Sequence, residues 1–187
     1  MSESQVKYIR APFDLTTATS LAAGDSVRIS GVILAARDAA HKRLCECLDS
    51  GQALPLDLTG HVVYYVGPSP AKPGHAIGSA GPTTSGRMDT YTPRLLACGL
   101  RGMIGKGYRS QSVLDAIKQY KVPYMAAVGG AGALIARSIK KYTVVAWPEL
   151  GPEALALMEV ENFPAICVID TLGHNQYDVG QAPYRTL

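Results

Sequence analysis

A nine-residue segment, GPTTSGRMD at 81–89, combines three hydroxyl side chains with one guanidinium. Its two glycines let the backbone approach a ligand closely, and its hydroxyl and N–H groups can donate hydrogen bonds. Arg87 can bind a carboxylate through two parallel hydrogen bonds. The segment therefore predicts a turn that binds a carboxylate. The alternative is that Thr83, Thr84 and Ser85 only cap the helix that follows.

Two further glycine-rich turns follow predicted strands and precede predicted helices. They are IGKGYRS at 104–110 and VGGAGA at 128–133. In an open α/β sheet such turns gather at the carboxyl edge, where ligands bind, and the helix N-termini favour an anion. Lys106 and Arg109 would add positive charge to this edge. The three turns together predict a site for a small anion.

Nucleotide-binding motifs fail when their positions are counted. A GxxxxGKS or GxxxxGKT loop would need glycine where Leu100 stands, and a hydroxyl residue after Lys106, where Gly107 stands. A GxGxxG motif begins at Gly105 but has Ser110 at its last position, and no acidic residue follows about 20 residues later. Dinucleotide binding is therefore only a weak alternative.

Side chains that could act as nucleophiles or bases are scarce. There is no GxSxG motif, and none of the histidines lies in a triad setting. They are expected to be structural or on the surface: His41, His61, His75 and His174. His41 is kept as a candidate because it lies four residues after Arg37 on a predicted helix. The glycine-rich turns carry no paired carboxylates, so they can bind a small diacid but would need a partner to transform it.

The composition disfavours several classes of function. Hydrophobic residues make up 47% and charged residues 18% of the chain, which is typical of globular proteins. No apolar run approaches the roughly 18 residues that a membrane helix needs. The first residues show no signal-peptide pattern, so we expect a cytoplasmic protein. The net charge is +3, and the basic residues have no interleaved aromatic residues, which disfavours nucleic acid as a partner.

The four cysteines do not form a metal-binding pattern. They stand at 45, 47, 98 and 167, with no CxxC motif and no accompanying histidine pattern. Cys45 and Cys47 lie two residues apart on a predicted helix and therefore face different directions. We expect free thiols in a reducing compartment and no metal bound by this chain alone.

The order of predicted elements indicates an α/β fold. The stretch 26–35 alternates polar and apolar residues and then becomes wholly apolar, as a strand does when first one face and then both are covered. Further strands are expected at 61–66, 102–104, 124–128, 143–146 and 165–170. Helices are expected at 39–48, with Asp38 as N-cap, and at about 88–98, 110–120, 132–140 and 152–158. This alternation predicts one domain over 1–187 with a mostly parallel sheet, flanking helices and an N-terminal arm at 1–23.

Six short motifs follow one another along the chain. They are ARDAAHKR at 36–43, YYVGP at 64–68, GPTTSGRMD at 81–89, IGKG at 104–107, VGGA at 128–131 and EVENFPA at 159–165. Together they resemble the C-terminal half, or separate β subunit, of the class I fumarate hydratases and of L(+)-tartrate dehydratase. The resemblance covers most of residues 25–178, and the shared order of several motifs makes it specific.

The resemblance implies a swivelling β/β/α domain that closes over a 4Fe-4S cluster. The cysteine ligands of that cluster belong to the fumarase α subunit, so this chain would bind no cluster itself and would be active only with that partner, in a homodimeric or heterotetrameric assembly. Matched by motif, Arg37, Arg87 and Lys106 would hold the carboxylates of a small dicarboxylate, with Thr84 at the same site. Thr83 would be the hydroxyl residue implicated in proton transfer, and it would need an activating environment because threonine is a very weak acid.

The resemblance thus implies the β subunit of an iron–sulfur hydro-lyase that hydrates fumarate to L-malate in the tricarboxylic acid cycle. The motifs around 39–43 and 160–164 are nearer to those of fumarase than to those of tartrate dehydratase. The alternatives are an L(+)-tartrate dehydratase β subunit, an enzyme for a methylated relative such as mesaconate, and a non-catalytic module that binds small anions.

Overall fold

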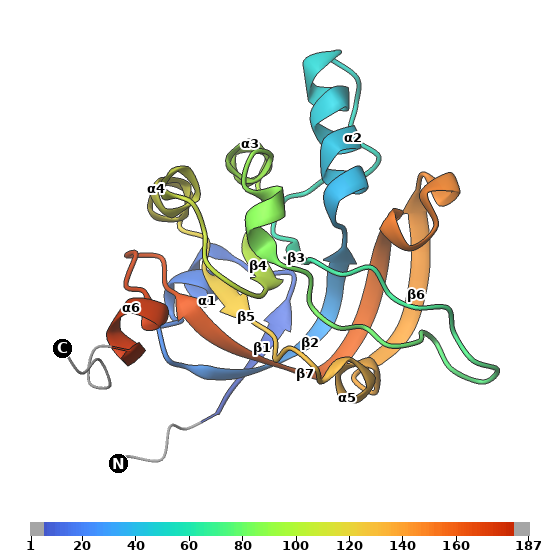
Figure 1. The fold of residues 1–187 in the computed structure, drawn as a ribbon. Coiled ribbons are helices and arrows are strands. Elements are labelled where there is room, and N and C mark those ends of the chain that lie inside the picture. The colour runs from blue at the N-terminus through green and yellow to red at the C-terminus, as the bar shows by residue number, and fades with distance from the viewer. Residues whose placement is uncertain (1–5, 182–187) are drawn as a thin grey trace.

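The computed structural model describes residues 6–181 (Figure 1). Within these residues the strands are β1 (Lys7–Ala11), β2 (Ser26–Ala35), β3 (Val62–Tyr64), β4 (Gly102–Gly105), β5 (Tyr124–Ala126), β6 (Ile139–Ala146) and β7 (Leu155–Ile169). The helices are α1 (Leu15–Thr19), α2 (Asp38–Asp49), α3 (Thr92–Ala97), α4 (Gln111–Tyr120), α5 (Gly132–Ala136) and α6 (Gln176–Gln181), with short 3-10 helices η1 (Ser85–Met88) and η2 (Pro148–Glu153). Residues 1–5 of the expected arm lie outside the described part, and the rest of it contains β1 and α1.

Five of the strands close into a barrel. β2, β3, β4 and β5 lie side by side and parallel, and β7 runs antiparallel between β5 and β2, which completes the ring. β1 pairs with β2 and β6 pairs with β7, so both extend the sheet beyond the ring. The expected mostly parallel sheet with flanking helices is therefore wrong. The fold is a closed mixed barrel with added strands, and only about 30% of the chain is helical.

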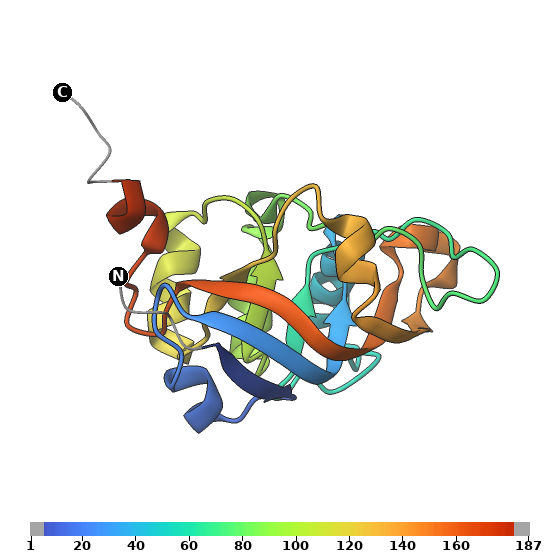
Figure 2. The same cartoon turned by 90° about the horizontal axis from the view of Figure 1, so that it is seen from below.

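The barrel closes because β2 and β7 are long enough to change partners along their length. β2 pairs with β1 through Val27–Gly31 and with β3 through Leu34 and Ala35, while β7 covers its other edge. β7 pairs with β6 in its first half and with β5 near its end. Gly31 (φ 113°) marks an irregularity in β2, where a Cβ atom would overlap the carbonyl oxygen of Ala11. Figure 2 shows the two long strands side by side, β2 in blue and β7 in orange.

The start of β7 contradicts a local sequence pattern. Leucine, alanine and methionine at 155–158 favour a helix, and a helix is expected at 152–158, but this segment is a strand from Leu155 onward. Pairing with β2 on one side and β6 on the other overrides the local preference. Pro164 is tolerated next to an irregularity where Asn162 has a φ of 52°. The helix expected at 132–140 likewise ends at Ala136 and is followed by β6.

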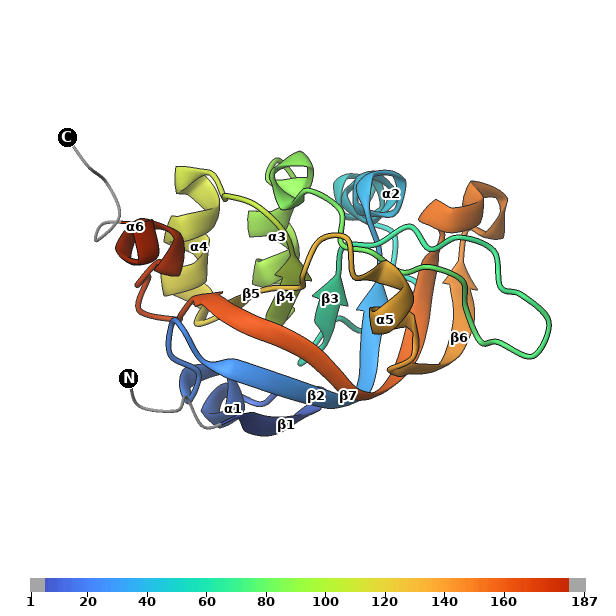
Figure 3. The same cartoon turned by 60° about the horizontal axis from the view of Figure 1, so that its bottom comes forward.

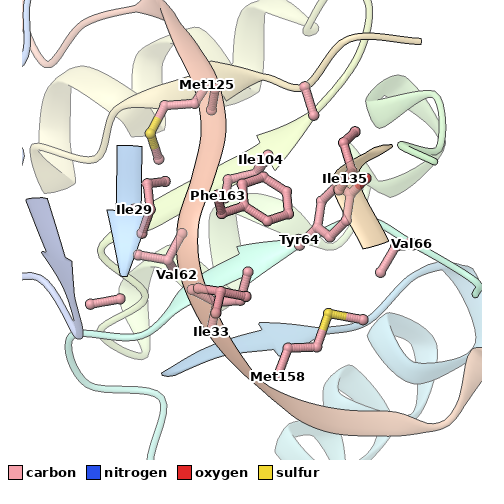
Figure 4. Packing of buried hydrophobic residues seen from close by; sticks show 14 of the residues in the cluster. Ile29, Ile33, Val62, Tyr64, Val66, Ile104, Met125, Ile135, Met158 and Phe163 are labelled. Carbon is pink, nitrogen blue, oxygen red and sulfur yellow. The ribbon is translucent and has the colours of Figure 1, made fainter. Parts of the chain in front are cut away.

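Apolar side chains from the strands of the ring fill the barrel (Figure 4). In β3 they alternate between the two faces. Tyr64 packs inside, with its ring centroid 5.0 Å from that of Phe163, while Val63 packs on the outer face, as does Tyr65 just after the strand. Both faces of this strand are buried, which explains its continuous apolar sequence.

Helices α2, α3 and α4 form a row along one side of the barrel (Figure 3). They lie in the connections between successive parallel strands from β2 to β5. Their buried side chains, including Leu44, Leu95 and Ile117, pack against the outward-facing side chains of the strands. No helix described within residues 6–181 has both the length and the apolar character that crossing a membrane requires.

Candidate functional site

The predicted site residues come from one end of the barrel, where the four parallel strands end. Backbone hydrogen bonds continue between neighbouring strands just past these ends, with 3.2 Å from Ala36 N to Tyr64 O and 2.9 Å from Ala127 N to Gly105 O. We call this end the carboxyl rim, and it consists of residues 36–38, 65–67, 81–87, 105–107 and 127–132. The expectation that the three glycine-rich turns meet at the carboxyl ends of the strands is therefore confirmed, although the sheet is closed rather than open.

The segment that contains Thr83 and Thr84 lies across the ends of β3 and β4. The backbone N–H of Thr83 donates to the carbonyl of Tyr65 at 2.8 Å, and Thr84 forms a parallel bridge with Lys106. Thr83 is half-buried and Thr84 is exposed. Within residues 6–181 no hydrogen bond engages the hydroxyl of Thr83 or that of Thr84. Thr83 is therefore held by its backbone, and its hydroxyl is free to act on a ligand.

Ser85 fixes this segment to the barrel. Its buried hydroxyl accepts from the backbone N–H of Lys106 at 3.1 Å and lies 2.8 Å from the hydroxyl of Tyr124, which donates to Gly107 O at 3.0 Å. Burial raises the pKa of Tyr124, so this phenol remains neutral. Gly105 is required here because a Cβ atom would overlap the Ser85 hydroxyl. Ser85 is therefore structural, and it does not cap η1 through its side chain.

Arg87 is already bound to a carboxylate of the protein itself. Its Nε lies 2.8 Å from Oδ1 of Asp38, and its Nη2 lies 2.8 Å from Oδ2. Asp38 also accepts from Nε of Arg37 at 3.1 Å. Burial acts to raise the pKa of the Asp38 carboxyl, but its own backbone N–H and the two guanidinium groups outweigh burial and lower it. The predicted carboxylate fork of Arg87 thus exists, and Asp38 is its ligand in this state.

Arg37 is held on three sides. Its Nη2 lies 3.0 Å from Oε1 of Glu153, and the other oxygen of Glu153 accepts from the backbone N–H of Ala39 at 2.9 Å. A Cβ atom on Gly67 would lie 2.7 Å from Nη1 of Arg37, so the guanidinium packs directly on this glycine. Arg37 occupies the N-cap position of α2, and Asp38, which was expected there, is the first helical residue.

Lys106 is the rim cation without an ion-pair partner among the described residues. It is exposed, and its aliphatic stem runs toward the third glycine-rich turn, since a Cβ atom on Gly129 would lie 3.9 Å from its Cδ. The first and third turns also touch, because Ala80 N donates to Gly132 O at 3.1 Å. Lys106 therefore stands on the second turn, bridged to the first through Thr84, with its aliphatic stem directed toward the third.

Arg109, expected to add charge to the rim, is buried instead. Its Nε lies 2.8 Å from Oδ1 of Asp89, and its Nη2 donates to the hydroxyl of Thr92 at 2.8 Å. The guanidinium carbon lies 5.2 Å and 5.1 Å from the ring centroids of Tyr65 and Tyr124. The Asp89 carboxylate also accepts from the backbone N–H of Ser110, the N-cap residue of α4. Arg109 is thus committed to this internal network, and the α4 N-terminus already has its anion.

His41 is buried and is not placed to act as a base at the rim. Its Nδ1 lies 3.0 Å from the carbonyl oxygen of Arg37, and its ring packs edge-on against Tyr65. Burial lowers its pKa to about 4. The imidazole is therefore neutral near pH 7, and its observed contacts support a structural role under Arg37.

The residues of this chain do not fit an iron–sulfur cluster. All four cysteines are free, and Cys45 and Cys167 are buried. Burial raises the pKa of both thiols, that of Cys167 to about 12, which opposes the thiolate form that metals bind. Among residues 6–181 no cluster of three histidine, cysteine or acidic side chains could hold a metal ion.

Two acidic residues bind the arginines of the site, and the sequence did not predict these contacts. Asp38 was interpreted as a helix cap, and Glu153 was not considered. The only available signal was the adjacency of Arg37 and Asp38, which does not reveal that Arg87, 49 residues away, shares the same carboxylate.

A separate groove of about 580 Å³ lies between the 69–79 loop and the α5–β6 region. Its lining includes the cationic side chains Lys72, Arg137 and Lys140 together with His75. None of the predicted site residues lines it, so it does not belong to the carboxyl rim.

Comparison with known proteins identifies relatives over most of the chain. The family model described as "Fumarase C-terminus" matches residues 3–180. "Fumarate hydratase class I, aerobic" of Escherichia coli (strain K12) is 44% identical over 149 residues, which are 79% of this chain and 27% of that protein. "Putative fumarate hydratase class I" of Geobacillus stearothermophilus is 34% identical over 182 residues, which are 95% of this chain and 34% of that protein. The chain thus spans about a quarter to a third of these two relatives.

A third relative has a length similar to that of this chain. "Putative L(+)-tartrate dehydratase subunit beta" of Methanocaldococcus jannaschii is 38% identical over 174 residues, which are 89% of each of the two proteins. This relative is named as a subunit, whereas the names of the other two mention no subunit.

Proposed function

Because the chain belongs to the fumarase C-terminus family, we propose that it is the dicarboxylate-binding β subunit of a cytoplasmic hydro-lyase. The relatives are named as fumarate hydratases and as a putative tartrate dehydratase subunit, which are enzymes that add or remove water. The proposed reaction is the reversible hydration of fumarate to L-malate, a step of the tricarboxylic acid cycle. The observation that carries the proposal is the convergence of Arg37, Thr83, Arg87 and Lys106 at the carboxyl rim.

The cationic residues of the rim bind the two carboxylates of the substrate. Arg87 is half-exposed and keeps its Nη1 group unengaged among the described residues, while Lys106 offers an unpaired ammonium. Charge-assisted hydrogen bonds of this kind contribute about 1.5–3 kcal/mol each. They act more strongly in the transition state if negative charge grows on the carboxylate as a proton leaves the neighbouring carbon.

Thr83 contributes a hydroxyl that no hydrogen bond engages among the described residues. Its backbone bond to Tyr65 fixes the segment, so the hydroxyl can donate a hydrogen bond to the reacting part of the substrate. We propose that it takes part in proton transfer together with a group from the partner. The threonine hydroxyl is such a weak acid that it stays protonated near pH 7, so it cannot act as a base alone.

The partner would be a fumarase α subunit that binds a 4Fe-4S cluster. The buried thiols of the present chain do not fit such a cluster, so we derive no catalytic step through it. Full activity would require both chains, in a dimeric or heterotetrameric assembly.

The second candidate is the β subunit of an L(+)-tartrate dehydratase. It is favoured by the 38% identity over 174 residues to the Methanocaldococcus jannaschii protein. Tartrate differs from malate by one hydroxyl group, so the two candidates share the carboxylate-binding rim and differ in the pocket that surrounds the central carbons.

The deciding experiment is anaerobic co-expression of this chain with a partner that covers the remaining part of the fumarate hydratases. The purified complex would be assayed with fumarate, L-malate, L(+)-tartrate and mesaconate, and each chain alone would serve as the control. Turnover of fumarate by the complex alone supports the proposal, and a preference for tartrate supports the second candidate. A stable complex that transforms none of these acids would favour a non-catalytic anion-binding module.

A further inference from the structure

Asp38 connects the two arginines of the carboxyl rim. Its Oδ1 accepts a hydrogen bond from Nε of Arg87 at 2.8 Å, its Oδ2 lies 2.8 Å from Nη2 of the same guanidinium, and Oδ2 also accepts from Nε of Arg37 at 3.1 Å. We propose that Asp38 is a positioning residue, which holds both guanidinium groups in the orientation that receives a substrate carboxylate. This inference rests on the function proposed above, because it concerns the same site.

Asp38 is the fixed member of the trio. It is the first residue of the twelve-residue helix α2, and its side chain is 28% exposed. Arg87, in contrast, stands on a four-residue 3-10 helix, and its side chain is 51% exposed. A long, half-exposed arginine would otherwise sample many rotamers, and ordering it on binding would cost conformational entropy. The bidentate bond to Asp38 removes part of that cost before the substrate arrives.

Glu153 also holds Arg37 and so extends the row of ion pairs. It binds Nη2 of Arg37 and the backbone N–H of Ala39, so the order of contacts is Glu153, Arg37, Asp38, Arg87. The four side chains tie η2, the start of α2 and η1 together across the rim. Arg37 and Arg87 therefore do not move independently of the elements that surround them.

In this arrangement the negative charge of Asp38 weakens substrate binding, whereas its positioning of the two arginines strengthens it. The two arginines and the two carboxylates sum to zero net charge, so Asp38 reduces the attraction of the rim for a dianion. If Asp38 contributed only its charge, its neutralisation would strengthen substrate binding. If it positions the arginines, its neutralisation weakens binding despite the added positive charge. The sign of the change in KM thus distinguishes the two roles.

The test compares Asp38→Asn with Asp49→Asn in the complex with the partner subunit. Asp49 is a matched control at the other end of α2, where it is also bound by one arginine, Arg94, at 2.6 Å and 3.3 Å. For Asp38→Asn we expect KM for fumarate to rise at least about tenfold with a smaller fall in kcat, and for Asp49→Asn we expect changes within about twofold. In an Arg87→Lys background, the effect of Asp38→Asn should shrink markedly, because the bidentate partner is already lost.

A lowered or unchanged KM in Asp38→Asn would overturn the positioning role. A wild-type complex without turnover would instead contradict the proposed function. In that event nitrogen NMR of this chain alone still tests the inference: the Nε–H of Arg87 should exchange slowly with solvent in the wild type and in Asp49→Asn, and rapidly in Asp38→Asn. Equal exchange in all three proteins would show that Asp38 does not restrain Arg87.

Discussion

Arg109 and Asp89 form a buried ion pair next to the turn that carries the proposed site. Arg109 Nε lies 2.8 Å from Asp89 Oδ1, and the side chains of the two residues are 0% and 13% exposed. The same guanidinium also donates hydrogen bonds to the hydroxyls of Tyr65 and Thr92. The pair therefore joins the 89–92 segment to the outer face of the barrel.

We expect Arg109→Leu to lower the free energy of unfolding by about 3–5 kcal/mol, because it leaves the Asp89 carboxylate buried without a counter-ion. Urea denaturation of this chain would measure the loss. The double variant Arg109→Leu with Asp89→Leu should recover part of the stability, since it removes both charges. A loss below about 1 kcal/mol in the single variant would contradict the structural importance of the pair.

Arg109 also shows where the sequence stops being informative about the site. Its position in a glycine-rich turn predicts a rim cation, as it correctly does for Lys106. The difference arises from Asp89 and Tyr65, which stand 20 and 44 residues away and whose contact with Arg109 depends on how the helices pack on the barrel. Spacing along the chain does not contain that information.

The fold likewise combines elements that local sequence predicts with a long-range pairing that it does not. The strand at 26–35 and the helices near 39–48 and 110–120 follow from local periodicity and are confirmed. Closure of the barrel depends on β7, whose first residues have helix-favouring side chains and whose pairing partners lie more than a hundred residues earlier in β2. A long-range pairing that overrides local propensity leaves little trace in a single sequence.

Gly67→Ala tests whether the position of Arg37 matters for substrate binding. A Cβ atom at this position would lie 2.7 Å from Nη1 and 2.9 Å from Cδ of Arg37, so the guanidinium must move. We expect KM for the dicarboxylate to rise about tenfold in the complex, with little change in melting temperature, because only a flexible side chain is displaced. Gly180→Ala in α6, where a Cβ atom meets nothing closer than 3.5 Å, is the control. An unchanged KM in Gly67→Ala would remove Arg37 from the proposed site.

His41 should make the stability of this chain fall with decreasing pH. Burial, and secondarily the charge of Arg109, lowers the folded-state pKa of His41 to about 4, while the unfolded chain takes up this proton near pH 6.5. Between these values the unfolded state binds more protons, so the stabilisation is complete above pH 6.5 and is lost as the pH falls toward 4. From pH 7 to pH 5 the loss should be about 2 kcal/mol.

Urea denaturation at the two pH values checks this expectation. His41→Phe should reduce the pH dependence, because it removes the buried imidazole. The half-buried His61, whose pKa is also lowered by burial, contributes to the slope in every variant and so does not disturb the comparison. A wild-type slope in His41→Phe would show that His41 is not the group responsible.

Thr83→Ala distinguishes a catalytic hydroxyl from a helix cap. Thr83 is not the cap of η1, since that position belongs to Thr84, and the backbone bond from Thr83 to Tyr65 survives the substitution. We therefore expect the melting temperature to change little, and kcat of the complex to fall at least about tenfold because the reacting part of the substrate loses its hydroxyl partner. Thr83→Ser should retain part of the activity. The opposite pattern, with unchanged kcat and a loss of about 0.5–2 kcal/mol in stability, would assign to the Thr83 hydroxyl a purely structural role.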